Sequence, residues 1–247
     1  MVAIALMGCD RLLGLTAVKP IDAAAIDAPS APPHLTQAFA WQLDNNKPQL
    51  ALLDYPVGLA LPASLVVVTV GLGNRTPGPT IDSVTYGGAQ LNMLVAIAGI
   101  PAANDDTSTL TEQWWLAAPQ LESGDLMVVL GSVGSSTHLS AMFFAGVNQQ
   151  QPFHDKQTIT GDDTSSMITV ATNPDEIVES VTGQGNSIIG PGSGSTSAFE
   201  DNGTNGDSLD NAWGSITPSA GSNTTVQWLY DPGIADGFQT VAASLRP

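Results

Sequence analysis

Positive charge is the scarcest property of this chain. Among its 247 residues, 6 Lys+Arg stand against 23 Asp+Glu, which gives a formal net charge of −17 at pH 7. No cluster of basic residues occurs along the sequence, and such an acidic surface repels phosphate backbones and anionic lipid headgroups. The composition therefore excludes nucleic-acid binding through a positively charged footprint.

Cysteine and the common catalytic patterns are also missing. The one cysteine, Cys9, excludes an intrachain disulfide and a zinc site with paired cysteine ligands. The sequence has no H-E-x-x-H pattern, no phosphate-cradling P-loop and no G-x-S-x-G nucleophile elbow. We therefore expect no nucleotide partner, no catalytic metal and no enzymatic activity.

Long helical patterns are absent as well. From Gln37 onward the apolar runs are short, Gly, Pro, Asn or Asp bound them, and none keeps helical periodicity over about ten residues. The 25 Gly and 17 Pro favour strands and turns. The unbroken runs at 64–70 and 125–130 are typical of central strands covered on both faces, whereas 224–230 alternates as a half-buried strand does.

These patterns predict an all-β fold. We expect an antiparallel, jelly-roll-like β-sandwich of about ten to twelve strands, because turn residues recur at the spacing typical of such folds. It should occupy residues 36–247 as a single domain. A glycine pair, Gly87-Gly88, should form a tight hairpin turn within it.

The residues before the cysteine resemble the lipobox of bacterial lipoproteins. Leu6-Met7-Gly8-Cys9 follows a short apolar run. The resemblance implies cleavage after Gly8 and lipidation of Cys9. Residues 1–8 are then a truncated signal-peptide remnant, because a complete signal has a basic start and an apolar stretch of about 7–15 residues. The alternative is a buried free cysteine in a first strand.

The stretch that follows supports the anchored interpretation. Residues 20–33 consist largely of Ala, Pro and Asp without periodicity, so residues 9–35 are predicted to form a flexible, disordered tether. A lipidated cysteine on such a tether places the folded part outside the cytoplasm, at the outer membrane or the cell surface. The membrane is then a partner through the lipid alone.

Five motifs in order resemble one family of secreted and surface-attached bacterial domains. They are SVTYGG at 83–88, EQWWLAAP at 112–119, GDL at 124–126, FFAGVNQ at 143–149 and AASLRP at 242–247. Members of that family read V-T-Y-G-G, E-x-W-x-L-x-x-P, G-V-x-Q and A-A-x-L-R. The resemblance runs from about Ser64 to Pro247 and implies a jelly-roll-like sandwich with no known activity. The Gly/Ser/Asn-rich stretch at 183–207 departs from the pattern.

An acidic loop offers the one candidate metal site. Carboxylates and amides are the oxygen ligands that Ca²⁺ prefers, and Asp201, Asn205, Asp207 and Asp210 lie together within residues 200–210. The spacing does not fit a helix-loop-helix calcium site, so an irregular site in a sandwich loop is expected. The alternative is a solvated turn loop with no bound ion.

The sequence thus predicts a non-catalytic, lipid-anchored cell-envelope protein with an adhesive or structural role, whose partner is a glycan or another surface protein. A first alternative is a carbohydrate-binding module, in which Trp114 or Trp115 faces solvent and stacks on a sugar. A second is a hydrolase, in which a serine or a carboxylate meets His138 or His154.

Overall fold

The computed structural model describes residues 31–42, 49–55, 63–75, 80–99, 108–117, 124–131, 136–184, 188–202, 211–231 and 237–247. Within these ranges every helix or strand is a β-strand, and paired strands run antiparallel, so the all-β prediction is confirmed. The same ranges hold no helix with the length and hydropathy needed to cross a membrane. Cys9 lies outside them, and the first strand begins at His34, inside the range predicted as tether.

Strands up to residue 145 form two sheets. The first inner sheet has the order β1-β9-β3-β7-β6, and the first outer sheet has the order β2-β8-β4-β5. Their bounds are β1 (His34–Gln42), β2 (Gln49–Tyr55), β3 (Leu65–Arg75), β4 (Ile81–Tyr86), β5 (Ala89–Gln90), β6 (Asn92–Ala98), β7 (Ser108–Ala117), β8 (Gly124–Leu130) and β9 (Ser136–Ala145).

Strands from residue 153 form two more sheets. The second inner sheet has the order β10-β17-β12-β15-β14, and the second outer sheet has the order β11-β16-β13. Their bounds are β10 (Phe153–Gly161), β11 (Ser165–Ala171), β12 (Ile177–Gln184), β13 (Ile188–Pro191), β14 (Thr196–Asp201), β15 (Asn211–Pro218), β16 (Asn223–Tyr230) and β17 (Phe238–Leu245).

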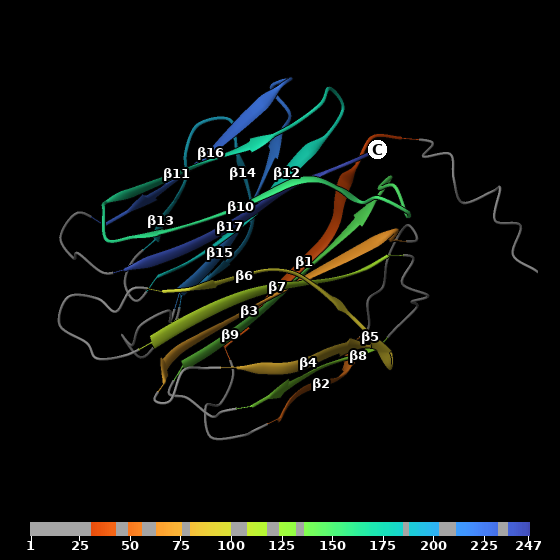
Figure 1. Cartoon of the computed structure of the whole chain (residues 1–247), viewed down its shortest axis with the longest axis vertical. Coiled ribbons are helices and arrows are strands. Elements are labelled where there is room, and N and C mark those ends of the chain that lie inside the picture. Colours follow the sequence, from red (N-terminus) through yellow and green to blue (C-terminus); the bar gives the residue numbers. More distant parts are fainter. Residues whose placement is uncertain are drawn as a thin grey trace, which may run out of the picture.

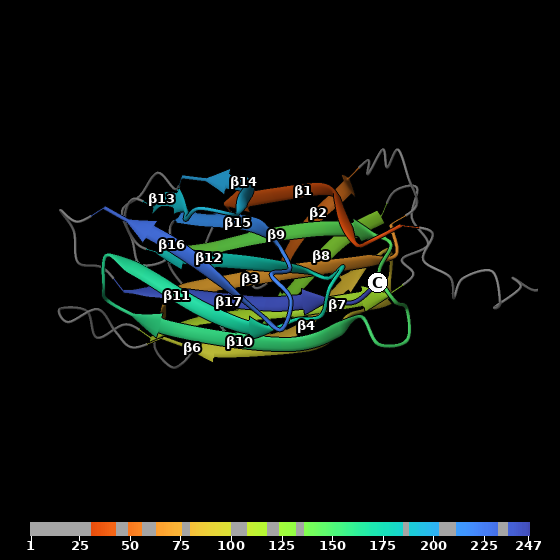
Figure 2. The same ribbon diagram turned by 90° about the horizontal axis from the view of Figure 1, so that it is seen from above.

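The four sheets are stacked as layers, with the first outer sheet at the bottom of Figure 1 and the second outer sheet at the top. Three hydrophobic cores fill the spaces between them. On β3, Val66, Val68 and Val70 face the first core while Leu65 and Val67 face the middle core, so this strand is covered on both faces as predicted. Seen from above, β11 and β16 cross over the inner strands of their half (Figure 2).

Two other strand predictions have different outcomes. On β16, Thr224, Val226, Trp228 and Tyr230 are all buried, so the predicted alternation is confirmed. On β8, in contrast, Asp125 and its outward-facing neighbours are exposed or only half-buried. The prediction that residues 125–130 are covered on both faces is wrong, because β8 belongs to an outer sheet and packs on one side only.

Both halves have the same topology. The inner order β1-β9-β3-β7-β6 of the first half corresponds strand by strand to β10-β17-β12-β15-β14 of the second half. The outer order β2-β8-β4 corresponds in the same way to β11-β16-β13. This is the strand order of a jelly roll. Residues 36–247, expected to form one sandwich, thus contain two, and the described residues hold seventeen strands rather than ten to twelve.

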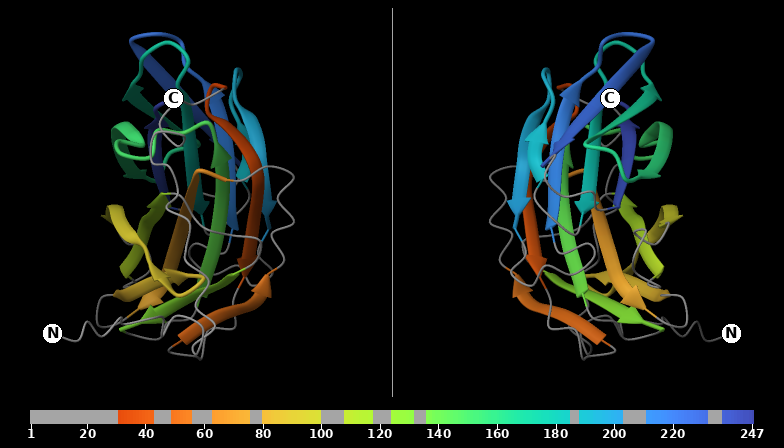
Figure 3. Two further views of the ribbon diagram at one scale, coloured as in Figure 1. Left: turned by 90° about the vertical axis from the view of Figure 1, so that its right-hand side faces the viewer. Right: turned by 90° about the vertical axis from the view of Figure 1, so that its left-hand side faces the viewer.

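The two sandwiches pack through their inner sheets about a pseudo-two-fold axis. β1 lies against β14 and β6 against β10, while β9 lies against β15 and β7 against β17. When each strand is replaced by its equivalent in the other half, the β1–β14 contact becomes the β10–β6 contact, and the β9–β15 contact becomes the β17–β7 contact. An interface with two-fold symmetry has this property. Figure 3 shows the teal-to-blue second half stacked on the orange-to-green first half.

The FFAGVNQ motif connects the two sandwiches. Phe143 enters the first core and Phe144 the middle core, because successive residues of β9 face opposite sides. Gly146 turns the chain with φ of 73°, a value that favours glycine. Val147 N then donates to Ser64 Oγ at 3.0 Å, and Asn148 Oδ1 accepts from Gln150 N at 3.0 Å. These residues fix the path from β9 to β10.

Candidate functional site

The two predicted sugar-stacking tryptophans lie on opposite faces of β7. Trp114 is 9% exposed and packs in the first core, where its Nε1 donates a hydrogen bond to Glu112 Oε2 at 3.0 Å. Burial raises the pKa of Glu112, and the bond from Trp114 opposes that effect. Trp115 is half-buried beside the middle core, with its ring edge-to-face on Phe153 at 5.5 Å between centroids. The expectation that Trp114 could face a sugar is therefore wrong.

The predicted calcium ligands are mostly not placed. Asn205, Asp207 and Asp210 all lie outside the described residues. Asp201 ends β14, and burial raises the pKa of its carboxyl. In the ranges that the structure describes, no group of three His, Cys, Asp or Glu side chains is arranged to hold a metal ion. The calcium site stays a prediction.

His138 and His154, the histidines considered for hydrolysis, have different surroundings. His138 is buried on β9 with its ring over Gly71 of β3. His154 is the second residue of β10, and its Nδ1 lies 3.0 Å from Glu176 Oε2. The side chain of His154 is 26% exposed and that of Glu176 only 1%. A carboxylate therefore does meet a histidine, but it comes from the β11–β12 turn rather than from the adjacent Asp155.

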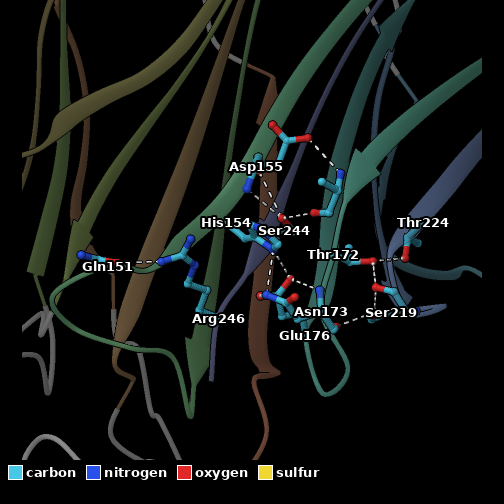
Figure 4. A network of polar contacts seen from close by, with 12 residues as sticks. Gln151, His154, Asp155, Thr172, Asn173, Glu176, Ser219, Thr224, Ser244 and Arg246 are labelled. Carbon is cyan, nitrogen blue, oxygen red and sulfur yellow. Dashed lines mark hydrogen bonds and ion pairs between the residues drawn. The ribbon is translucent and has the colours of Figure 1, made fainter.

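The Glu176 carboxylate is occupied by structural hydrogen bonds (Figure 4). Besides His154, it accepts from Asn173 N at 2.8 Å and from Asn173 Nδ2 at 3.1 Å. These bonds close a tight turn in which Asp175 has φ of 68°. The arrangement holds this turn against β10, because its three donors come from the turn itself and from the first residues of that strand.

A serine close to this cluster is also occupied. Ser244 is fully buried on β17, and its Oγ accepts from Asp155 N at 2.9 Å and donates to Ala171 O at 2.9 Å. Ala171 N in turn donates to Asp155 Oδ2 at 2.9 Å, and hydrogen bonds to that carboxylate hold its pKa below the ordinary value despite partial burial. Ser244 thus joins β10, β11 and β17 and is not positioned as a nucleophile.

The outward face of the second outer sheet has a different character. Met167, Ile189 and Leu229 are 63%, 57% and 37% exposed. Leu229 lies between the other two, because it pairs with Gly190 of β13 on one side and Ser165 of β11 on the other. Cross-strand diagonals bring Met167 within reach of Leu229. We call these three side chains and the sheet surface around them the apolar face.

The apolar face carries no charged side chain among the described residues of β11, β13 and β16. Its remaining outward positions are Ser165, Thr169, Ala171, Pro191, Asn223, Thr225 and Gln227. Thr169 and Thr225 hydrogen-bond to one another at 2.9 Å. The net charge of −17 is thus carried by other surfaces, and a contiguous exposed apolar patch is typical of an interaction surface.

Acidic residues border one end of this face. Asp162 and Asp163 lie in the turn that leads into β11, and Asp231 directly follows β16. Tyr230 N donates to Thr164 O at 2.9 Å, which holds these two ends together. The face therefore has an apolar centre and an acidic rim on one side. The first outer sheet differs, since Asp82 and Asp125 are exposed on its own strands.

Sequence reasoning missed this face although a signal was present. Leu229 lies on the outward side of β16, the side of Thr225 and Gln227, so the sequence has an apolar residue at a position predicted to meet water.

Comparison with known proteins adds no relative: no family model matches the chain, and neither the curated proteins nor the solved structures include a match.

Proposed function

We propose that this chain is a non-catalytic, lipid-anchored cell-envelope protein that docks a partner protein through the apolar face, in an adhesive or structural role. The observation that carries the proposal is the uncharged outward surface of β11, β13 and β16, with Met167, Ile189 and Leu229 exposed. The lipobox-like sequence Leu6-Met7-Gly8-Cys9 supports the lipid anchor and, with it, the cell-envelope location.

The chemistry of the face favours a protein over a glycan. Sugar-binding surfaces rely on exposed aromatic rings, but Trp228 and Tyr230 of β16 point into the core. Aliphatic side chains at the centre of a flat face are instead typical of protein interfaces, where burying each contributes about 1.5–3 kcal/mol.

The charge distribution selects among protein partners. A second copy of this chain also carries −17 and would bring Asp162 and Asp163 close to like charges. A partner with an apolar patch bordered by Lys or Arg instead complements both the centre and the rim. We therefore assign the face to a basic partner protein rather than to self-association.

Cell binding tests the docking surface. A soluble form with Cys9→Ser, added to cells of the source organism, should bind, and Met167→Glu should reduce that binding at least tenfold because it places a charge in the interface. Met93 of β6 is 56% exposed and provides the matched control. Met93→Glu should bind normally. Equal binding by both variants contradicts the proposal.

Detergent partitioning tests the anchor. The full chain made from its native gene should enter the detergent phase of a cloud-point separation, because two or more acyl chains hold a protein in a micelle or membrane. Cys9→Ser should move it to the aqueous phase. An aqueous wild-type protein with an unmodified thiol by mass spectrometry contradicts the anchored location while leaving the docking test unaffected.

A further inference from the structure

The layer between the two inner sheets has a polar end. Thr69 of β3 pairs with Ser140 of β9 and with Gln113 of β7, so these three side chains form one cross-strand row on the face toward the second half. Glu179 of β12 lies opposite, since Gln113 Nε2 donates to Glu179 Oε2 at 3.1 Å. All four residues are at most 1% exposed.

Each of these four side chains keeps one oxygen atom that no described residue satisfies. These atoms are Thr69 Oγ1, Gln113 Oε1, Ser140 Oγ and Glu179 Oε1. An unsatisfied buried polar group costs about 1–3 kcal/mol, so a folded chain rarely keeps several together without a bound species. Four unsatisfied oxygen atoms thus lie in the row formed by Thr69, Gln113 and Ser140 and on Glu179 opposite it. This concentration points to one bound species shared by the four side chains.

The neighbouring polar contacts show that this layer can satisfy itself. Thr111 Oγ1 donates to Gln239 Oε1 at 2.6 Å, and Gln239 Nε2 donates to Thr109 Oγ1 at 3.0 Å. These bonds also cross between β7 and the second half. The row at Thr69 therefore differs from this neighbouring group, whose polar side chains satisfy one another across the layer.

The internal repeat shows that the fold does not require polar residues here. The strand registers make β3 equivalent to β12, β9 to β17 and β7 to β15. At the position equivalent to each of the four polar residues, the other half has a residue without a polar side chain. The matches are Glu179 with Val67, Thr69 with Val181, Ser140 with Val241 and Gln113 with Gly214. The polar set therefore makes a single site that breaks the pseudo-symmetry.

We propose that Thr69, Gln113, Ser140 and Glu179 form an internal water-binding site between the two sandwiches. A water molecule donates two hydrogen bonds and accepts two. Here two hydroxyl groups can donate to it, while the Gln113 carbonyl and the Glu179 carboxyl oxygen accept. Buried waters typically make about three hydrogen bonds to otherwise unsatisfied groups, and the site supplies that number.

A water fits this donor set better than a cation. Burial raises the pKa of Glu179 to about 8, so near neutral pH its carboxyl carries a proton, which weakens it as a cation ligand. A cation would also leave the Thr69 and Ser140 hydroxyl hydrogens without acceptors. Because hydroxyl groups rotate, a water can instead bond the Glu179 carboxyl in either protonation state.

A double-mutant cycle tests the bridge. Thr69→Val and Glu179→Val each introduce the residue that the other half already has at the equivalent position. Since no direct hydrogen bond joins Thr69 to Glu179, a bridging water predicts coupling: the double variant should shift the urea midpoint by clearly less than the sum of the single shifts. Thr69→Ser, which keeps the hydroxyl, should restore the coupling. Additive shifts overturn the proposal.

Solution NMR of the unmodified full chain provides a second measurement that needs no variant to fold. The methyl groups of Thr69, Val67 and Val181 should show nuclear Overhauser cross-peaks at the water frequency that indicate a long-lived bound water. Their absence overturns the site. A urea midpoint that rises in NaCl relative to choline chloride at equal ionic strength assigns the site to a cation and also overturns the proposal.

Discussion

Burial changes the acid–base chemistry of Glu179. It is fully buried, and desolvation raises its pKa from 4.5 to about 8, against the opposing effect of the bond from Gln113. A carboxyl group whose pKa is raised by folding binds a proton that the unfolded chain releases. The free energy of unfolding must therefore decrease as pH rises from about 4.5 to about 8, and change little with this group above that range.

Replacing Glu179 by glutamine tests this dependence. Glu179→Gln keeps the bond to Gln113 but cannot ionise, so it should be more stable than wild type above pH 8 by roughly 3–5 kcal/mol and nearly equal to it at pH 4. Urea unfolding across this pH range measures the difference. The comparison separates Glu179 from His138 and Lys156, two other titratable side chains that the structure describes on this layer. A difference that does not vary with pH contradicts the assignment.

Individual residue roles were only partly accessible from the sequence. Two adjacent tryptophans had to point to opposite faces of a strand, and Trp114 and Trp115 do so. Which face meets solvent depends on how many sheets are stacked, and that number was underestimated. The partner of His154 was also inaccessible, because Glu176 comes close through the β11–β12 turn.

At the scale of single strands, the pattern of alternation predicts burial when only one side is covered. β16 follows its period of two residues, and its buried face was correctly identified. The run in β8 is apolar without alternation, yet its strand lies in an outer sheet, where Met127 and Val129 are half-buried rather than covered. Continuous apolar runs therefore do not by themselves distinguish inner from outer strands in a stack of this kind.

The repeat was missed because its sequence signal is short. The segments that run through β3 and β12 share Gly71-Leu72-Gly73-Asn74 and Gly183-Gln184-Gly185-Asn186, with Leu65 and Ile177 at equivalent starts. Between those positions the interior residues differ, since Val67 corresponds to Glu179. Strand pairing shows the repeated strand order and the sequence alone does not, because many side-chain combinations can fill one strand order.

Gly71 makes a close strand contact possible and gives a test at this scale. A Cβ at Gly71 would lie 2.2 Å from His138 Nε2, on the neighbouring strand, and the ring is buried. Gly71→Ala should destabilise the protein by about 1–3 kcal/mol through overpacking. The same change in a His138→Ala background should cost clearly less, as measured by urea unfolding. Equal costs in both backgrounds contradict this account of the β3–β9 contact.

At the scale of the whole molecule, two jelly rolls share the middle core and present two unlike outer sheets. The outer sheet of the first half exposes Asp82 and Asp125, whereas that of the second half is uncharged. The two halves therefore share a strand order but differ at their outer sheets, since one has an ordinary solvated surface and the other has the apolar face. This asymmetry, in a molecule of net charge −17, is the basis for assigning docking to β11, β13 and β16.

Site-specific photo-cross-linking in living cells tests that assignment most directly. A photoreactive amino acid is placed at Met167 on the apolar face or at Met93 on β6, two methionines of comparable exposure on different sheets. Docking predicts one discrete adduct from position 167, reduced by Leu229→Glu, and none from position 93. Adducts of equal yield from both positions, or none from position 167 when the chain is at its native level, would contradict the central claim.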